Sequence, residues 1–126
     1  MLCAMIHWSL VICEDLISSR KFGLAVAQQA RPGDSMIVLG DYESANSISF
    51  YQPLLVQVAG GIAYSLVPGM KYPDAPRIVL PMDDFHSLWN SERRVFVLLP
   101  KARVEELFPA GTPVLEVLDR VLVRNR

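Results

Sequence analysis

A short apolar strand that runs directly into a Gly-Asp turn constrains the fold of this chain more than any other feature. Residues 37–51 read IVLGDYESANSISFY, so a segment with a polar first turn follows the Gly-Asp pair. In an open α/β sheet, such a turn places backbone N–H groups and small polar side chains at the carboxyl edge of the strand, where ligands bind. The run therefore predicts an α/β fold and marks the sheet edge at which a function is expected.

The rest of the chain alternates between strand and helix patterns. Two continuous apolar runs, at residues 36–39 and at 95–99 within a strand expected at 94–99, are typical of strands covered on both faces. Further strands are expected at residues 54–58 and 77–80, helices at 19–30, 44–52, 83–89 and 100–108, and closing strands at 113–117 and 120–123. This order predicts a three-layer α/β domain with a mainly parallel central sheet and a C-terminal antiparallel hairpin.

A long connection interrupts the alternation. Residues 60–76 are rich in glycine and proline, and we expect a loop there with one short strand around residues 63–66. Loops of this length in compact domains are often functional or cover another surface.

Composition excludes several classes of protein. The chain has 126 residues, 52% of them hydrophobic, and a formal net charge of −1 with no basic stripe. A nucleic-acid partner is therefore not expected, and one domain is the natural size class. Cys3 and Cys13 would lie about 15 Å apart on a helix, which is too far for a disulfide.

The N-terminal segment, residues 1–17, differs from the domain expected at residues 18–126. Leu2 to Cys13 is apolar apart from His7 and Ser9, and Glu14-Asp15 follows it. The run is too short to span a bilayer and lacks the features of a signal peptide. Two interpretations remain open: a partly buried first helix, or the remnant of a longer membrane helix.

No motif in the chain supplies a catalytic constellation. Asp83, Asp84 and His86 could be imagined as metal ligands, but neighbouring positions on one helix point in different directions. Carboxylates in the first turn of a helix explain the two aspartates better. There is no Walker-type loop, no GxGxxG and no GxSxG. We therefore expect no catalytic residue, no metal site and no cofactor.

Candidate binding residues gather after the first predicted strand. Asp41, Tyr42, Ser44, Asn46 and Tyr51 could line a groove for a polar ligand or a partner surface, together with the loop at residues 64–72. The alternative is structural: Asp41 or a following polar residue caps the helix, and Asn46 lies on its solvated side.

Several motifs, taken in order, resemble one family. The motifs are, in order, the run 37–51, Tyr72-Pro73-Asp74-Ala75-Pro76, Leu88-Trp89, residues 94–100 and residues 121–126. They resemble the extramembrane C-terminal region of bacterial polytopic membrane glycosyltransferases. These are similar to dolichyl-phosphate-mannose–protein mannosyltransferases and to the aminoarabinose transferases of lipid A. The resemblance covers residues 18–126.

The resemblance implies an accessory role. In that family a sugar is taken from a polyprenyl phosphate at the periplasmic face of the inner membrane, and the catalytic acidic residues lie in the membrane portion. No catalytic residue can be assigned here, so this chain is expected to be inactive alone and to partner a membrane catalytic domain, with Leu2–Cys13 as a possible membrane contact. Two alternatives stay open: a free-standing α/β module that binds a small polar or phosphorylated ligand, and an interaction protein that associates through its apolar N-terminal segment.

Overall fold

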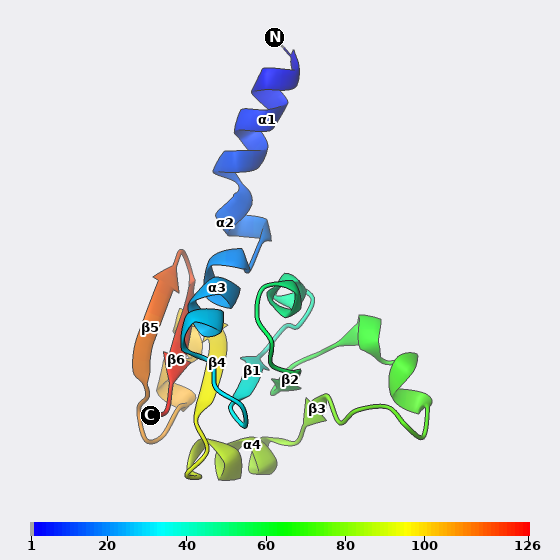
Figure 1. Ribbon diagram of the computed structural model, residues 1–126, viewed down its shortest axis with the longest axis vertical. Helices are drawn as coiled ribbons and strands as arrows, with labels where there is room; N and C mark the ends of the chain where they lie inside the picture. Colours follow the sequence, from blue (N-terminus) through cyan, green and yellow to red (C-terminus); the bar gives the residue numbers. More distant parts are fainter. Residues whose placement is uncertain (1) are drawn as a thin grey trace.

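Six strands form one central sheet in a computed structural model, which describes residues 2–126 (Figure 1). Their order is β3-β2-β1-β4-β6-β5. The strands are β1 (Ser35–Leu39), β2 (Val56–Ala59), β3 (Val79–Leu80), β4 (Val95–Pro100), β5 (Thr112–Val117) and β6 (Arg120–Arg124). β1, β2, β3 and β4 pair in parallel, whereas β6 runs antiparallel to both β4 and β5. The predicted fold class is confirmed.

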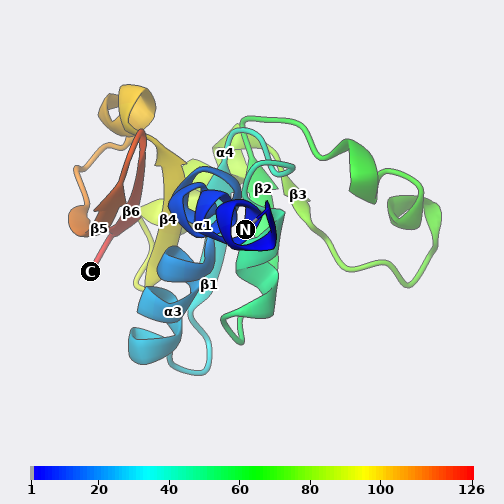
Figure 2. The same ribbon diagram turned by 90° about the horizontal axis from the view of Figure 1, so that it is seen from above.

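Helices cover both faces of the sheet (Figure 2). The α-helices are α1 (Leu2–Ile12), α2 (Glu14–Ile17), α3 (Arg20–Gln29) and α4 (Met82–Trp89), and the 3-10 helices are η1 (Asn46–Phe50), η2 (Tyr64–Leu66), η3 (Gly69–Lys71) and η4 (Lys101–Glu106). α3 and η1 pack on one face, and α4 packs on the other.

The central strands are buried on both faces, as their continuous apolar runs predict. In β1, Met36 and Val38 point toward α3, whereas Ile37 and Leu39 join the cluster around α4. This alternation follows from the two-residue period of a strand. Because both faces are covered by helices, both sets of side chains must be apolar.

One local prediction is wrong: residues 64–66 form the 3-10 helix η2 rather than a strand. The helices expected at residues 44–52 and 100–108 are present but shorter, as the 3-10 helices η1 and η4. At the start of α3, the hydroxyl of Ser18 accepts a hydrogen bond from the N–H of Arg20 at 3.1 Å.

α1 projects away from the body of the domain (Figure 1). The residues from Cys3 to Ile12 are exposed, so the interpretation of this segment as a partly buried first helix is wrong. α1 has 11 residues, and none of the helices within residues 2–126 combines the length and apolar character needed to cross a membrane. The connection between β2 and β3 also extends outward, on the β3 side of the sheet (Figure 2).

Candidate functional site

The strand order identifies the edge of the sheet where a ligand would be expected. The chain passes from β1 outward to β2 and β3, and then returns to place β4 on the other side of β1. The carboxyl ends of β1 and β4 therefore form the switch point of the sheet, which is the usual ligand crevice of an open α/β fold. The Gly40-Asp41 turn lies at this point, as the sequence predicts.

A small cavity of about 50 Å³ lies at the switch point. Asp41 and Ser44 contribute to its wall from the turn after β1, Pro100 from the end of β4, and Arg120 from the start of β6. A cavity of this size holds a few water molecules and is too small for a sugar or a nucleotide.

Asp41 and Ser44 are held by bonds within their own turn. One carboxylate oxygen of Asp41 accepts a hydrogen bond from the N–H of Glu43 at 2.9 Å, and the hydroxyl of Ser44 donates to the carbonyl oxygen of Asp41 at 3.0 Å. These are the local side chain to backbone bonds by which aspartate and serine stabilise turns. The turn therefore accounts for both residues without a ligand.

The other three candidate residues lie elsewhere. Tyr42 packs against the apolar cluster on the α3 face, and Asn46 is exposed at the first position of η1. Tyr51 lies beside α3, where a Cβ built on Gly23 would come within 2.6 Å of the Tyr51 Cβ. The structure brings Asp41 and Ser44 together at the switch point, but it does not bring these three residues to the same cavity.

Arg120 is the residue at this edge that sequence analysis misses. Its guanidinium donates hydrogen bonds to the hydroxyl of Ser19 at 3.0 Å and to the carbonyl oxygens of Ser44, Asp15 and Ser18 at 3.1, 3.2 and 3.2 Å. It also lies over the ring of Phe22, 5.2 Å from the centroid. An arginine at the start of a terminal strand gives no signal in the sequence of such long-range contacts.

A second hollow lies beside the first, between the ends of β1 and β2. It is shallow, about 490 Å³ in volume, and its wall includes Asp41, Glu43 and the glycine pair at residues 60 and 61. Close approach of the two turns requires Gly61, because a Cβ there would lie 1.7 Å from the carbonyl oxygen of Gly40. The glycine pair therefore serves chain packing.

An ion pair is bonded to one of the residues that line this hollow, Gly60. Arg103 donates to the carbonyl oxygen of Gly60 at 3.0 Å and to both carboxylate oxygens of Glu106 at 2.7 Å. The hydrogen bonds from Arg103 lower the pKa of Glu106, burial opposes this shift, and the charges of Arg103 and His86 lower the pKa further. The hydrogen bond to Glu106 raises the pKa of Arg103 although burial opposes it. Both groups stay charged, and neither is poised to transfer a proton near neutral pH.

Within residues 2–126, no three His, Cys, Asp or Glu side chains gather closely enough to hold a metal ion. Asp83 and Asp84 lie in the first turn of α4, as the sequence predicts.

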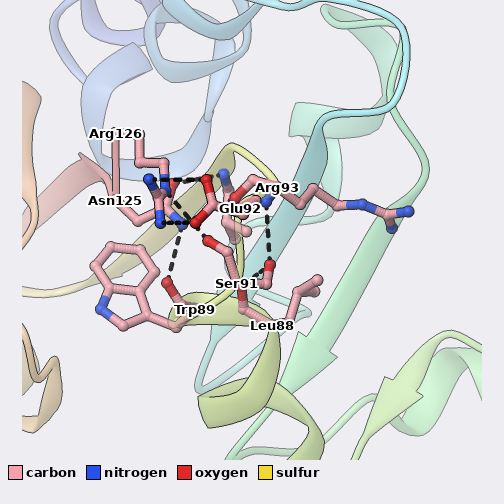
Figure 3. A network of polar contacts seen from close by, with 8 residues as sticks. Leu88, Trp89, Ser91, Glu92, Arg93, Asn125 and Arg126 are labelled. Atoms are coloured by element: carbon pink, nitrogen blue, oxygen red, sulfur yellow. Dashed lines mark hydrogen bonds and ion pairs between the residues drawn. The ribbon is translucent and has the colours of Figure 1, made fainter.

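A dense polar network lies at the opposite, amino edge of the sheet (Figure 3). Asn125 donates to the carbonyl oxygens of Trp89 at 2.9 Å and Arg93 at 3.0 Å, and it accepts from the N–H of Val95 at 2.9 Å. Arg126 donates to the carbonyl oxygen of Ser91 at 3.2 Å. Because these bonds mostly involve backbone groups, the network fastens the C-terminus to the loop between α4 and β4.

Comparison with known proteins identifies solved structures that share this fold. No protein-family model matches the chain, and no curated protein matches it. The crystal structure of ArnT from Cupriavidus metallidurans bound to undecaprenyl phosphate matches with a TM-score of 0.65 and 18% identity, over 85% of this chain and 19% of that one. The apo structure of the same protein matches with a TM-score of 0.61 and 22% identity, over 85% of this chain and 20% of that one.

This chain has the fold of one part of ArnT. The likeness confirms, at the level of fold, the resemblance to aminoarabinose transferases that the sequence motifs indicate. The chain spans about a fifth of the length of ArnT, so the likeness concerns a part of that protein.

Proposed function

We propose that this chain is an extramembrane accessory domain of a membrane glycosyltransferase that uses a polyprenyl-phosphate-linked sugar. The observation that carries the proposal is the match to a fifth of ArnT over 85% of this chain. ArnT was crystallised with undecaprenyl phosphate, which is a polyprenyl phosphate. The order of the sequence motifs supports the same family independently of the fold.

The division of the chain into residues 1–17 and 18–126 fits this role. Residues 18–126 carry the sheet and its covering helices, whereas α1 is apolar apart from His7 and Ser9 and is exposed from Cys3 to Ile12. A helix that is hydrophobic on all sides belongs in an apolar environment. We therefore interpret α1 as the end of a membrane-embedded segment. The domain then lies at the inner membrane, on the periplasmic face, beside the catalytic membrane portion.

The accessory character of the domain is supported by the state of its charged groups. At the carboxyl edge, Arg103 is paired with Glu106, Arg120 is bonded to backbone oxygens, and Asp41 is bonded within its turn. A general acid or base needs a free site and a shifted pKa near neutrality. The charged groups of this edge are already paired or bonded, which supports an accessory rather than a catalytic role.

A transfer assay tests this proposal directly. The purified chain, mixed with a polyprenyl-phosphate-linked aminoarabinose donor and lipid A, should form no product, whereas a complete membrane transferase under the same conditions should form it. Measurable turnover by this chain alone would contradict the accessory role.

A second candidate function rests on the cavity at the switch point. Its wall contains Asp41, Ser44 and Arg120, which are groups that could meet a small phosphorylated ligand. Thermal denaturation with inorganic phosphate tests this candidate, with a sugar phosphate as the control that a cavity of about 50 Å³ should not admit. A stabilisation that disappears in the variant Asp41→Ala would favour the ligand-binding module over the accessory domain.

A further inference from the structure

The N-terminal helices are fastened to the carboxyl edge of the sheet. Arg120 pairs in register with Pro100 at the end of β4, so it lies at this edge. From there its guanidinium bonds the carbonyl oxygens of Asp15 and Ser18 and the hydroxyl of Ser19, which together form the junction between α2 and α3. Arg120 therefore determines where the N-terminal segment leaves the domain.

Three further contacts hold the same junction. The N–H of Ser19 donates to the hydroxyl of Ser47 in η1 at 2.8 Å. Two ion pairs join α2 to α3: Glu14 with Arg20 at 3.3 Å, and Asp15 with Lys21 at 2.7 Å. With several bonds across one short connection, α1 and α2 extend from the carboxyl edge in a defined direction (Figure 1).

Large apolar side chains surround the point where the helices leave. Leu16 and Ile17 in α2 are 67% and 68% exposed, and Ile62, which follows β2 at the same edge, is 49% exposed. Leu118 is 51% exposed in the turn between β5 and β6, two residues before Arg120. Its φ of 54° lies in the left-handed region, which a leucine adopts only at a cost of about 1 kcal/mol or more. The turn therefore keeps a leucine exposed in spite of this conformational cost.

The amino edge differs in character. Its loops carry the polar network of Asn125 and Arg126 and the ion pair between Asp34 and Arg94. Large apolar side chains are exposed there too, Leu55 (57%) before β2 and Phe108 (84%) on the segment that returns toward β5. What distinguishes the carboxyl edge is that the apolar helix α1 leaves the domain from it.

We propose that the carboxyl edge of the sheet lies against the headgroup layer of a lipid bilayer in which α1 is embedded, with Leu16, Ile17 and Leu118 in the interfacial region. This inference rests on the proposed function, because it takes α1 as membrane-embedded. It adds the orientation of the domain and assigns Arg120 as the residue that sets it.

The chemistry of this edge fits a lipid surface. Apart from His7 and Ser9, the side chains of α1 are apolar on all sides, as in a helix that lies in an apolar phase. The two acids that end the apolar stretch, Glu14 and Asp15, are each paired with a base. Pairing lowers the cost of holding a carboxylate near an apolar phase. The bases at the edge are also paired, since Lys101 bonds Glu116 and Arg103 bonds Glu106. The surface therefore fits zwitterionic lipid and does not require anionic lipid.

Fluorescent labels on two matched leucines test the orientation. The full chain with Cys3→Ser and Cys13→Ser, both free cysteines, receives a single cysteine in either Leu118→Cys or Leu55→Cys. These leucines are similarly exposed, 51% and 57%, and lie at opposite edges. Each variant is labelled with an environment-sensitive fluorophore and reconstituted into phosphatidylcholine vesicles. We expect a blue shift and a several-fold rise in intensity at position 118, and no change at position 55.

Trp8 reports independently on α1. It is 68% exposed, whereas the other tryptophan, Trp89, is buried. Brominated lipid should quench Trp8, and the variant Trp8→Phe supplies the background from Trp89. Suppose that Trp8 is quenched, but the label at position 118 does not respond or the labels at 118 and 55 respond equally. The proposed orientation of the domain is then overturned, whereas the embedding of α1 in the membrane is supported. If Trp8 is not quenched, the membrane-embedded helix fails, and the orientation fails with it.

The role of Arg120 is tested in the same vesicles. Arg120→Lys keeps the charge but cannot bond three separate oxygens in the planar fork geometry of a guanidinium. With the fold checked by circular dichroism, this variant should keep the quenching of Trp8 and lose most of the difference between positions 118 and 55. An undiminished difference would overturn the assignment of Arg120 as the residue that sets the orientation.

Discussion

The ion pair between Asp34 and Arg94 is the best buried charge pair of the domain and makes a quantitative prediction. One carboxylate oxygen of Asp34 accepts from Nε and Nη2 of Arg94 at 2.9 and 2.6 Å and from the N–H of Arg31 at 2.8 Å. Arg94 also bonds the carbonyl oxygen of Gln29 at the end of α3. The pair thus joins the end of α3, the start of β1 and the start of β4.

The variant Asp34→Asn removes the charge and keeps the shape. The side chains of Asp34 and Arg94 are only 9% and 17% exposed, so the arginine is left with an unpaired and largely desolvated charge. Breaking such a pair costs about 3–5 kcal/mol when it is fully buried. Because Arg94 retains some contact with water and asparagine still accepts one hydrogen bond, we expect the free energy of unfolding to fall by about 3 kcal/mol. With a urea dependence of roughly 1.5 kcal/mol per molar, the midpoint falls by about 2 M.

The assay is urea unfolding followed by the fluorescence of the buried Trp89, in a mild nonionic detergent that covers α1. Burial by itself would raise the pKa of Asp34, but the hydrogen bonds from Arg94 and from the N–H of Arg31, and the charges of Arg94 and Arg31, outweigh it and hold that pKa below its ordinary value. The stabilisation is therefore complete above about pH 4, the unfolded pKa, and is lost as the pH falls through the lower folded pKa. The difference between wild type and Asp34→Asn should narrow below pH 4.

The exposed ion pair between Glu92 and Arg126 provides the control. Its atoms lie 3.3 Å apart and Glu92 is 94% exposed, so Glu92→Gln should change the free energy of unfolding by less than about 0.5 kcal/mol. If Asp34→Asn is as mild as this control at pH 7, or if its effect is as large at pH 3 as at pH 7, the reasoning about the buried pair is refuted.

Two further variants test the packing. Gly61→Ala should lower the free energy of unfolding by at least about 3 kcal/mol, because the added Cβ would meet the Gly40 carbonyl. Gly69→Ala is the control: a Cβ there has nothing within 4 Å, so the free energy of unfolding should change little. Equal denaturation midpoints for the two variants would contradict this expectation. Trp89→Phe should cost about 2 kcal/mol, because the indole N–H donates to the carbonyl oxygen of Pro109 at 2.8 Å. Thermal unfolding followed by far-ultraviolet circular dichroism measures that loss, and an unchanged melting temperature would show that neither the bond nor the ring volume matters.

The sequence predicts the centre of the fold better than its periphery. β1 and β4 are continuous apolar runs whose neighbours on both faces must also be apolar, so their pattern has one interpretation. The segments at residues 46–50 and 101–106 are different. Each has only five or six residues, and over that length a period of three and a period of 3.6 cannot be distinguished. Because nucleation of an α-helix costs the most in its first turn, such short segments form 3-10 helices.

The candidate site shows the same limit. The Gly-Asp turn after β1 is predictable, because local bonds of Asp41 and Ser44 decide its geometry. The position of Arg120 depends on β6 pairing with β4 and on α2 lying across that edge. The contact between Arg120 and Asp15 joins residues 105 positions apart in the chain, and no local pattern encodes it.

In most open α/β sheets, the switch point is an open crevice that a ligand fills. Here the side chain of Arg120 enters this crevice and bonds the junction of the chain's own N-terminal helices, leaving about 50 Å³. A ligand that displaced Arg120 would have to replace four hydrogen bonds and would also release the junction. The usual ligand-binding position of the fold is therefore occupied by the side chain that attaches the N-terminal helices to the sheet.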